Sequence, residues 1–432
     1  MPGENEKKTS PDSLLQKKFL LASTGLLLAE LVPWTIDECI RKVDYTHITW
    51  QTTSYNLSPA HWTWDNDGFT TNQFGHPYQG SLFYSAFRAN GYSFWQSAPA
   101  SFAGSYLWET FAENQAPAPN DFINTGFGGI TLGEMTYKLA NRILDNRSRG
   151  LERQVREIFA LLVNPMNGFR RLVDGRWGKV YGNSTEHDSS IIYTEFDLGL
   201  RSFKVNNSDG GFGFYGHVKL LYGTPFENYK TPFSNIYINA ELGQDDSSKL
   251  NIVNVYGSLN GWRISNKEKS KHLLVLSMNY DYINNEAFFY SAQSVKLNLF
   301  SEFSLIKNIK INTSIGAGPV ILSAVPDIYL YEGRNYDFCS GVGFHANFLL
   351  GIAGHFFYAV NYRGGWLKTL NGNANDYFLN AVTSELRIML ADNFSICAEP
   401  GYFRLHANFK NYADVNRSYP YLRISARYGL NL

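Results

Sequence analysis

Strict alternation of apolar and polar residues through the C-terminal half of the chain limits the possible folds more than any other feature. In the last segment the apolar face consists of Leu422, Ile424, Ala426, Tyr428, Leu430 and Leu432. Successive side chains of a β-strand point to opposite faces, so a period of two predicts strands rather than helices. About twelve such segments occur between residues 189 and 432. Each reaches the roughly 9–11 residues that a tilted transmembrane strand needs.

The polar faces of these segments carry charges of both signs. We expect the following residues to face a lumen: Glu195, Asp197, Arg201, Lys219, Glu385, Arg387, Arg423 and Arg427, with Glu241, Asp281, Lys296, Glu302 and Arg363 on similar faces. A soluble barrel or sandwich would turn such charges outward, and alternation alone does not exclude it. The long strands, their even number and the rings near strand ends, such as Trp366 and Tyr419, favour an outer-membrane barrel.

The links between these strands predict two different rims. Short polar links such as Ala391–Asn393 and Gly354–His355 alternate with longer ones at residues 226–235 and 326–338. Outer-membrane barrels have short turns on one side and longer loops on the other. The sequence therefore predicts an α+β chain, in which an N-terminal helical module precedes an antiparallel transmembrane β-barrel of about twelve strands.

Charge and aromatic content agree with a membrane setting. Lys and Arg number 38, as do Asp and Glu, and aromatic residues make up 16% of the chain. A balanced charge excludes electrostatic capture of nucleic acid as the main role, and abundant rings suit a bilayer interface. We expect outer-membrane lipid and lipopolysaccharide as partners, with other envelope proteins possible and the oligomeric state open.

The N-terminal part has a helical period instead. It divides into a polar, disordered segment over residues 1–18 and a helical module over 19–175, before the barrel at 189–432. The apolar run Phe19–Val32 resembles a signal peptide but lacks a small-x-small cleavage site, continues as an amphipathic helix to about Val43, and is too short to span a bilayer. A signal for export would lie upstream, or this run would serve twice. We expect the module in the periplasm or partly in the lumen.

A polar cluster is predicted within three helices, from about Pro77 to Asn90, from Phe94 to Asn114, and from Asn120 onward. Its members are His76, Arg88, Glu109, Glu113, Asp121, Asn124 and Glu134. Glu109 and Glu113 are four residues apart and would share a helix face. The carboxylates suit ion pairs and capping, or else acid–base chemistry or metal binding. His76 suits helix entry or a base, and small residues at Ala100, Gly104, Gly129 and Gly133 permit close helix contact.

No cofactor or metal is predicted. The chain lacks nucleophile-elbow, zinc and phosphate-loop motifs. Asp65–Gly68 has some resemblance to a calcium loop, but without the remaining ligand spacing it reads as a turn. The cysteines Cys39, Cys339 and Cys397 have no metal-site spacing and read as packing residues, with a Cys339–Cys397 disulfide as the alternative.

Several blocks of the helical module resemble a known family. They are Trp64–Asp67 (WDND), Asn72–Gly80 (NQFGHPYQG), Arg88–Ser97 (RANGYSFWQS), Trp108–Glu109 and Gly128–Glu134 (GGITLGE). Over residues 20–175 the chain resembles the largely Bacteroidetes envelope proteins of the domain of unknown function 3943. That resemblance implies export and a helical module ahead of a β-rich tail, and it implies no activity. Glu109, Asp121 and Asn124 also follow an order similar to VanZ-like membrane helices, which implies a packed polar cluster at a membrane.

Two functional hypotheses follow. The first is an outer-membrane barrel for envelope transport or organisation, with the helical module as a cap or plug. The alternative is an outer-membrane enzyme acting on lipid or lipopolysaccharide through His76, Glu109, Glu113 and Asp121. An adhesin or scaffold acting through long loops is a third possibility.

Overall fold

The computed structural model describes residues 17–144, 148–179, 190–204, 212–243, 248–285, 288–306 and 308–431. They form two compact units. The helical unit comprises the residues before Asn66 together with 74–190, and the barrel unit comprises Asn66–Gln73 together with the residues from Ile191 onward. The segment predicted to be disordered, apart from Lys17 and Lys18, and the terminal Leu432 lie outside the described residues.

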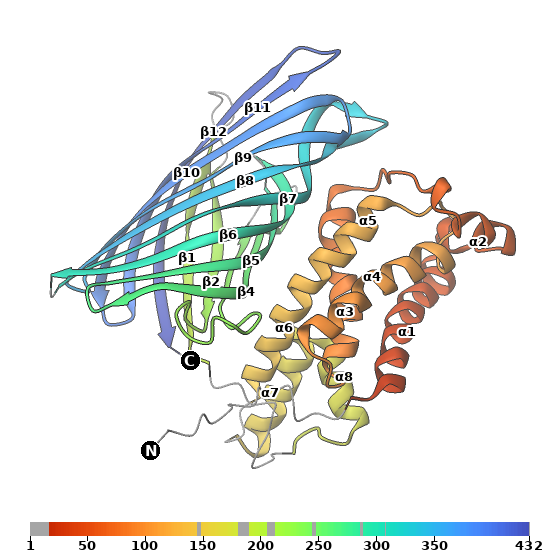
Figure 1. Ribbon diagram of the computed structural model, residues 1–432, viewed down its shortest axis with the longest axis horizontal. Coiled ribbons are helices and arrows are strands. Elements are labelled where there is room, and N and C mark those ends of the chain that lie inside the picture. Colours follow the sequence, from red (N-terminus) through yellow and green to blue (C-terminus); the bar gives the residue numbers. More distant parts are fainter. Residues whose placement is uncertain are drawn as a thin grey trace. The chain divides into compact units, whose positions relative to one another are not determined.

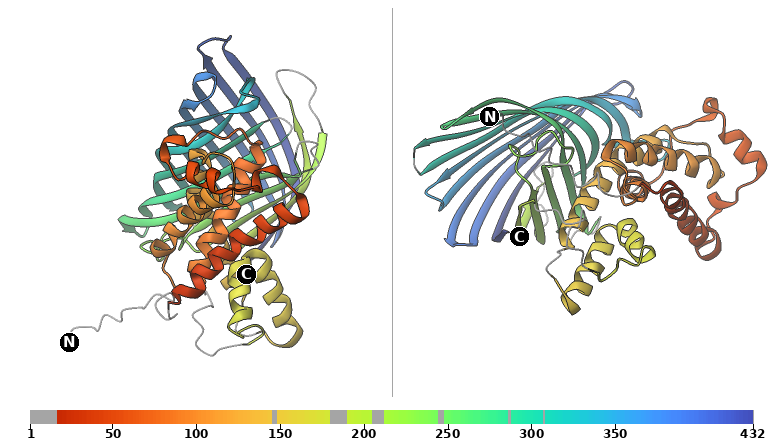
Figure 2. Two further views of the ribbon diagram at one scale, coloured as in Figure 1. Left: turned by 90° about the vertical axis from the view of Figure 1, so that its right-hand side faces the viewer. Right: turned by 60° about the horizontal axis from the view of Figure 1, so that its bottom comes forward.

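Twelve antiparallel strands close into a barrel, so the predicted fold class is confirmed (Figure 1). Figure 2 shows the inclination of the strands and the curvature of the sheet. Each strand pairs with its neighbours in sequence, and β1 pairs with β12, so the sheet has no free edge. The strands are β1 (Ile192–Phe203), β2 (Phe212–Tyr222), β3 (Ile236–Gly243), β4 (Leu250–Lys267), β5 (Ser270–Asn284), β6 (Phe289–Ile306), β7 (Ile309–Tyr331), β8 (Arg334–Ile352), β9 (Phe356–Asn371), β10 (Ala374–Ala391), β11 (Phe394–Phe409) and β12 (Val415–Asn431).

The alternation separates an apolar outer wall from a polar inner wall. Leu198 is 73% exposed and Trp366 is 44% exposed on the outside, whereas Asp197 and Arg427 are buried on the inside. Directly paired residues share a face, which is why Asp197 meets Arg427 across the β1–β12 ladder. An apolar band turned away from the charges is the arrangement that a barrel in lipid requires.

The two rims of the barrel differ from the predicted pattern. Tyr193 pairs with Asn431, so β1 begins and β12 ends at one rim, here called the terminal rim, and the opposite one is the far rim. The expected long link over 326–338 is wrong, because these residues pair as the ends of β7 and β8 around Glu332–Gly333. The link that contains 226–235 joins β2 to β3 at the terminal rim, together with the tight turns that precede β9 and β11.

The helical unit consists of α-helices of 5–18 residues with π-helical and 3₁₀ turns among them. Its α-helices are α1 (Phe19–Ile36), α2 (Trp50–Asn56), α3 (His76–Arg88), α4 (Phe94–Phe111), α5 (Pro119–Ile123), α6 (Gly129–Ile143), α7 (Gly150–Val163) and α8 (Pro165–Val173). A π-helical turn, Asn124–Gly128, connects α5 to α6, so the predicted third helix is continuous but wider at that turn. An apolar core joins α1, α3 and α4 through Leu26, Phe83 and Ala100.

Helix α1 corrects one expectation from the sequence. Its apolar run was expected to be too short for a bilayer, but the helix continues through the π-helical turn Asp37–Arg41. The helical segment Phe19–Arg41 has 23 residues and a window of mean hydropathy 1.6, and only 28% of that window is buried. By length and composition this segment is long and apolar enough to cross a membrane.

Glycines allow the helix backbones of this unit to touch, as the spacing of small residues predicted. A Cβ atom on Gly80 of α3 would lie 2.0 Å from the Thr125 carbonyl oxygen, and one on Gly129 would lie 2.6 Å from the Gly80 Cα. A Cβ on Gly133 would meet the Tyr84 ring at 2.6 Å. Close backbone approach of this kind explains why side chains of α3 and α6 form short polar contacts.

Candidate functional site

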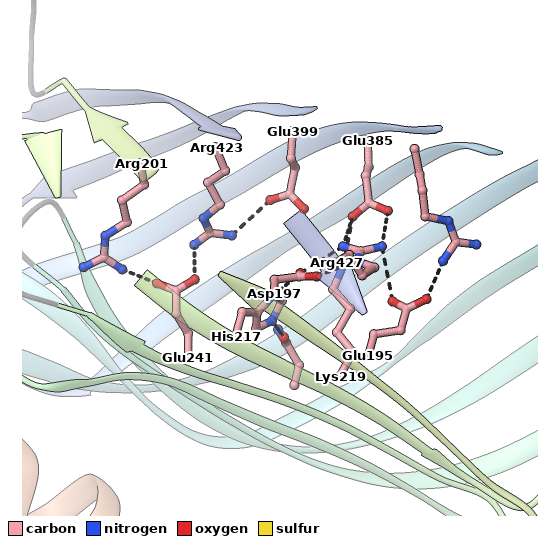
Figure 3. Close-up of polar contacts among 12 residues, drawn as sticks. Glu195, Asp197, Arg201, His217, Lys219, Glu241, Glu385, Glu399, Arg423 and Arg427 are labelled. Atoms are coloured by element: carbon pink, nitrogen blue, oxygen red, sulfur yellow. Dashed lines mark hydrogen bonds and ion pairs between the residues drawn. The ribbon is translucent and has the colours of Figure 1, made fainter. Parts of the chain in front are cut away.

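A network of ion pairs lines the inner wall built from β1–β3 and β10–β12 (Figure 3). These strands are neighbours in the closed barrel although the two groups are far apart in sequence. We call the following twelve residues the lumen network: Glu195, Asp197, Arg201, His217, Lys219, Asn239, Glu241, Glu385, Arg387, Glu399, Arg423 and Arg427. It contains every residue of the eight that the alternation placed towards the lumen.

Arg427 of β12 is the centre of this network. Its Nε lies 2.6 Å from Asp197 Oδ1, and its Nη1 lies 2.7 Å from Glu385 Oε1 and 3.2 Å from Glu195 Oε2. Lys219 of β2 reaches across to Glu385, with 2.9 Å between Nζ and Oε2. One guanidinium therefore binds carboxylates from β1 and β10, on both sides of its own strand.

Arg423 forms a second branch of the network. It lies four residues before Arg427 on the same inward face of β12. Its Nη2 lies 2.7 Å from Glu241 Oε2 of β3, and its Nη1 lies 3.0 Å from Glu399 Oε1 of β11. Arg201 of β1 pairs with the same Glu241 carboxylate. The branch thus connects β3, β1, β12 and β11 by ion pairs.

The network is electrically balanced. His217 Nδ1 lies 3.2 Å from Asp197 Oδ2 and its other ring nitrogen contacts Asn239, while Arg387 pairs with Glu195. Five carboxylates face five lysine and arginine side chains within the lumen network. A wall of this kind is strongly polar yet has no excess of either charge.

Three members of the lumen network were missed in the sequence: His217, Asn239 and Glu399. His217 lies two residues before Lys219 on the same inward face of β2, so the alternation itself could have identified it. Glu399 is followed by Pro400, a residue that argues against a paired strand because it cannot donate a backbone hydrogen bond. Pro400 nevertheless lies in the β11–β12 ladder opposite Leu422.

A second set of inward charges lies on β5, β6, β8 and β9. Arg363 Nη1 is 3.3 Å from Asp281 Oδ1, and Lys296 and His345 lie on the same inward face of their strands. The side chain of Arg363 is 49% exposed although it points into the barrel. Water therefore reaches this part of the inner wall.

The polar cluster predicted in the helical unit separates into three sets. Glu109 and Glu113 do not share a helix face as expected, because α4 ends at Phe111 and Glu113 follows it. Glu109 accepts a hydrogen bond from the Ala118 backbone N–H at 3.0 Å, and Glu113 accepts one from the Trp108 indole. Both carboxylates thus accept hydrogen bonds at the end of α4 or in the connection that follows it.

Arg88 and Glu134 form a buried ion pair between α3 and α6. Arg88 Nε is 2.7 Å from Glu134 Oε2, and Nη2 is 3.1 Å from Oε1. The Tyr84 hydroxyl donates to Glu134 Oε2 at 2.6 Å, and the guanidinium lies 4.4 Å from the centre of the Tyr137 ring. Burial alone would lower the pKa of Arg88, but the Glu134 carboxylate raises it well above its ordinary value.

His76 and Asp121 form the third set. His76 is the first residue of α3, and its Nε2 lies 3.4 Å from Asp121 Oδ1 of α5. Burial lowers the pKa of His76 to about 4, although the Asp65 carboxylate acts in the opposite direction. Asn124 is buried at the start of the π-helical turn. Of the carboxylates in the acid–base hypothesis, only Asp121 is beside His76.

Metal binding finds no support in the parts of the chain that the structure describes. No group of three or more His, Cys, Asp and Glu side chains there could hold a metal ion. Cys339 and Cys397 are buried and both are free, whereas Cys39 is exposed. The packing interpretation therefore fits Cys339 and Cys397 and not Cys39.

The segment Asn66–Gln73, here called the barrel anchor, belongs to the barrel unit although it precedes β1 by more than a hundred residues. Phe69 inserts its ring among three aromatic side chains of the barrel. Its centroid lies 5.6 Å from that of Tyr282, 4.9 Å from that of Phe289 and 5.7 Å from that of Tyr336. Aromatic contacts at these separations are favourable beyond the area that they bury.

Hydrogen bonds hold the backbone of the barrel anchor on both sides of Phe69. The Tyr336 hydroxyl donates to the Asp67 carbonyl at 2.8 Å and accepts from the Asn72 side-chain amide at 2.8 Å. The Tyr280 hydroxyl donates to the Gln73 carbonyl at 2.5 Å. The expected turn at Asp65–Gly68 is thus the start of a docked segment.

The barrel anchor binds the outer face of the wall. Tyr336 lies on the same face of β8 as Phe344, which is an exposed apolar residue of the outside. Tyr280 alternates with Asp281, which points inward to pair with Arg363. This part of the predicted cap or plug therefore does not enter the lumen.

Replacing Phe69 with alanine is expected to release the barrel anchor. The lost ring contacts cost about 2 kcal/mol, less than in a closed core because a docked segment can relax. Hydrogen–deuterium exchange of the backbone amides of residues 66–73 should accelerate in the full-length protein. Trp366→Ala, which removes an exposed outer ring elsewhere on the barrel, should leave that exchange unchanged. Equal exchange in the two variants would show that Phe69 does not hold the segment.

Solved structures of outer-membrane barrels are similar to this chain at low identity. The NanC porin is 12% identical, with a TM-score of 0.30 over 53% of this chain and 98% of that porin. An outer-membrane channel from Pseudomonas putida F1 is 9% identical, with a TM-score of 0.34 over 56% and 95% of the two chains. An anion-selective porin from Comamonas acidovorans is 8% identical, with a TM-score of 0.26 over 56% and 100%.

The comparison with protein families concerns the helical unit and the barrel anchor. No curated protein matches the chain. The matched family residues include the block Asn72–Gly80 and the ion pair of Arg88 with Glu134. Residues 61–166 match the model of the family described as Domain of unknown function (DUF3943), which confirms the resemblance carried by the motifs of the helical module.

Proposed function

We propose that this protein is an outer-membrane channel for small polar solutes. The exposed Arg363 side chain on the inner wall is the observation that carries this proposal. Eight-stranded barrels fill their interior with side chains, and a barrel of twelve strands is wider because the diameter grows with the number of strands. A charged side chain that is half exposed inside the barrel supports a hydrated interior.

The character of the inner wall supports a polar and weakly charge-selective path. The lumen network is balanced in charge, and its carboxylates and guanidinium groups can replace hydration contacts of a passing solute. The opposite wall adds Lys296 and Arg363 against Asp281. We therefore expect a slight preference for anions over cations, and not a strong one.

Planar-bilayer recording of the purified full-length protein tests the proposal. In a potassium chloride gradient the wild-type channel should show a reversal potential close to zero. Arg363→Glu replaces an inward positive charge with a negative one, so the reversal potential should move towards cation selectivity. Absence of conductance from the folded wild-type protein, and also from folded Phe288→Ala and Phe403→Ala variants, would contradict a channel.

Arg404→Glu is the matched control for Arg363→Glu. It makes the same change of charge on β11, but Arg404 lies on the outward face, where its Nε donates to Asn416 Oδ1 at 3.1 Å. The reversal potential should therefore stay at the wild-type value. Equal shifts from both substitutions would show that the selectivity arises from surface charge and not from the lumen.

A further inference from the structure

Near the far rim, an aromatic side chain from one wall of the barrel contacts rings of the opposite wall. Phe288 stands immediately before β6, and its ring lies 5.8 Å from Phe403 of β11 and 5.6 Å from Tyr419 of β12, measured between centroids. In the closed strand order β6 and β12 are half the circumference apart. A contact between them therefore passes through the lumen and not along the wall.

The position of Phe288 is fixed by its own backbone. Its N–H donates to the Asn285 side-chain oxygen at 2.9 Å, and its carbonyl accepts from the Asn285 N–H at 3.1 Å. The Tyr290 ring stacks beside it at 6.3 Å between centroids. Phe288 is 8% exposed. The ring is thus buried against the opposite wall and is not a freely moving loop residue.

A second crossing contact lies at the same rim. Tyr329, near the end of β7, stacks on Tyr412 at 4.4 Å between centroids and meets Phe409 at 4.9 Å. Its hydroxyl donates to the Ala413 carbonyl at 2.9 Å, in the link between β11 and β12. Three strands separate β7 from β11 in the barrel. Two independent segments therefore reach towards β11 and β12.

These crossing rings belong to one apolar cluster inside the far rim. The cluster takes inward residues from β4 to β12, among them Ile252, Ile283, Val325, Cys339, Leu367, Tyr377, Leu405 and Tyr419. It differs sharply from the lumen network, which is charged and lies towards the terminal rim on β1 and β10. Apolar constrictions exclude water and ions even where the backbone leaves space.

We propose that the channel is gated at the far rim and that Phe288 is the gate residue. This inference rests on the proposed channel function and adds its regulation. In the closed state Phe288 packs on Phe403 and Tyr419 and excludes water from the passage. Withdrawal of this one ring from Phe403 and Tyr419 would connect the hydrated lumen to the outside of the far rim. The gate thus belongs to the barrel itself and does not need the helical unit as a plug.

Single-channel recording of the full-length protein tests the gate. Wild-type protein should open rarely or to a small conductance. Phe288→Ala should raise the time-averaged conductance severalfold, and Phe403→Ala should do so from the opposite wall. Phe344→Ala is the matched control, since it removes the same ring from the exposed outer face of β8. Its conductance should equal that of wild type. Heat-modifiable mobility on gels verifies that each variant is folded.

The outcomes separate the gate from the channel. A wild-type conductance equal to that of Phe288→Ala and Phe403→Ala would overturn the gate and leave the channel in place. Silence of all folded variants, including both ring deletions, would overturn the channel and the gate together. If Phe288→Ala alone fails to fold, the conductance of Phe403→Ala tests the gate, because that variant keeps the hydrogen bonds between Asn285 and Phe288.

Discussion

Replacing Arg427 with methionine will lower the free energy of unfolding of the barrel by about 3–5 kcal/mol. Arg427 is 3% exposed and contacts Asp197, Glu385 and Glu195. Methionine keeps most of the side-chain volume but removes the positive charge. Three carboxylates are then left close together with fewer cations, and buried charge that loses its partner is far more costly than an exposed one.

Urea unfolding of the barrel in detergent, followed by heat-modifiable mobility on gels, measures this loss. Arg404→Met is the control, because Arg404 lies on the outward face and its removal should cost little. The double variant Arg427→Met with Asp197→Leu should be more stable than Arg427→Met, since it removes one of the orphaned carboxylates. A loss no larger than that of Arg404→Met would mean that water in the lumen solvates these carboxylates.

The helical unit should respond as strongly to Arg88→Met. This substitution leaves the fully buried Glu134 carboxylate with only the Tyr84 hydroxyl among the contacts described above. The expected cost is about 3–5 kcal/mol, the range for breaking a buried pair by removing one partner. Because Arg88 and Glu134 lie on α3 and α6, the helices should also separate more easily where Gly80 meets Gly129.

Circular dichroism at the helical wavelength, recorded during urea unfolding of the full chain, measures this effect. Arg156→Met is the matched control: Arg156 Nη2 is 3.0 Å from Glu152 Oε1, but the pair is exposed on α7. Exposed pairs of this spacing contribute about 0.5 kcal/mol or less. Glu134→Gln combined with Arg88→Met should recover part of the stability. Similar midpoints for Arg88→Met and Arg156→Met would show that the buried pair contributes little.

The barrel was predictable because the face to which a side chain points depends only on its position within its own strand. The alternation of apolar and polar residues identifies the side chains that share a face. Closure of the sheet then brings Asp197 and Arg427 together. The prediction was weaker where the chain leaves this pattern. Phe288 lies just before β6, and its partners on β11 and β12 depend on closure of the whole barrel, which the pattern within one strand does not contain.

The helical cluster was predictable in composition and not in geometry. Spacing on one helix placed Glu109 and Glu113 together, but α4 ends at Phe111 and separates them. The π-helical turn Asn124–Gly128 also rotates the following residues away from an ordinary helical register. The pairing of Arg88 with Glu134 follows from the contact of two helices through glycines, a tertiary fact that no spacing within one helix contains.

The barrel anchor has a consequence for how the chain can come apart. Asn66–Gln73 binds the outer wall and β1 starts at Ile192. Residues 74–190 therefore form a long loop in the topological sense, because the segments before and after them both belong to the barrel unit. Closing a loop of that length carries only a modest entropic cost. A single protease cut within the loop would therefore not shed the N-terminal fragment, which stays attached through Phe69 and its hydrogen-bonded neighbours. Cleavage and dissociation become separate events in this protein.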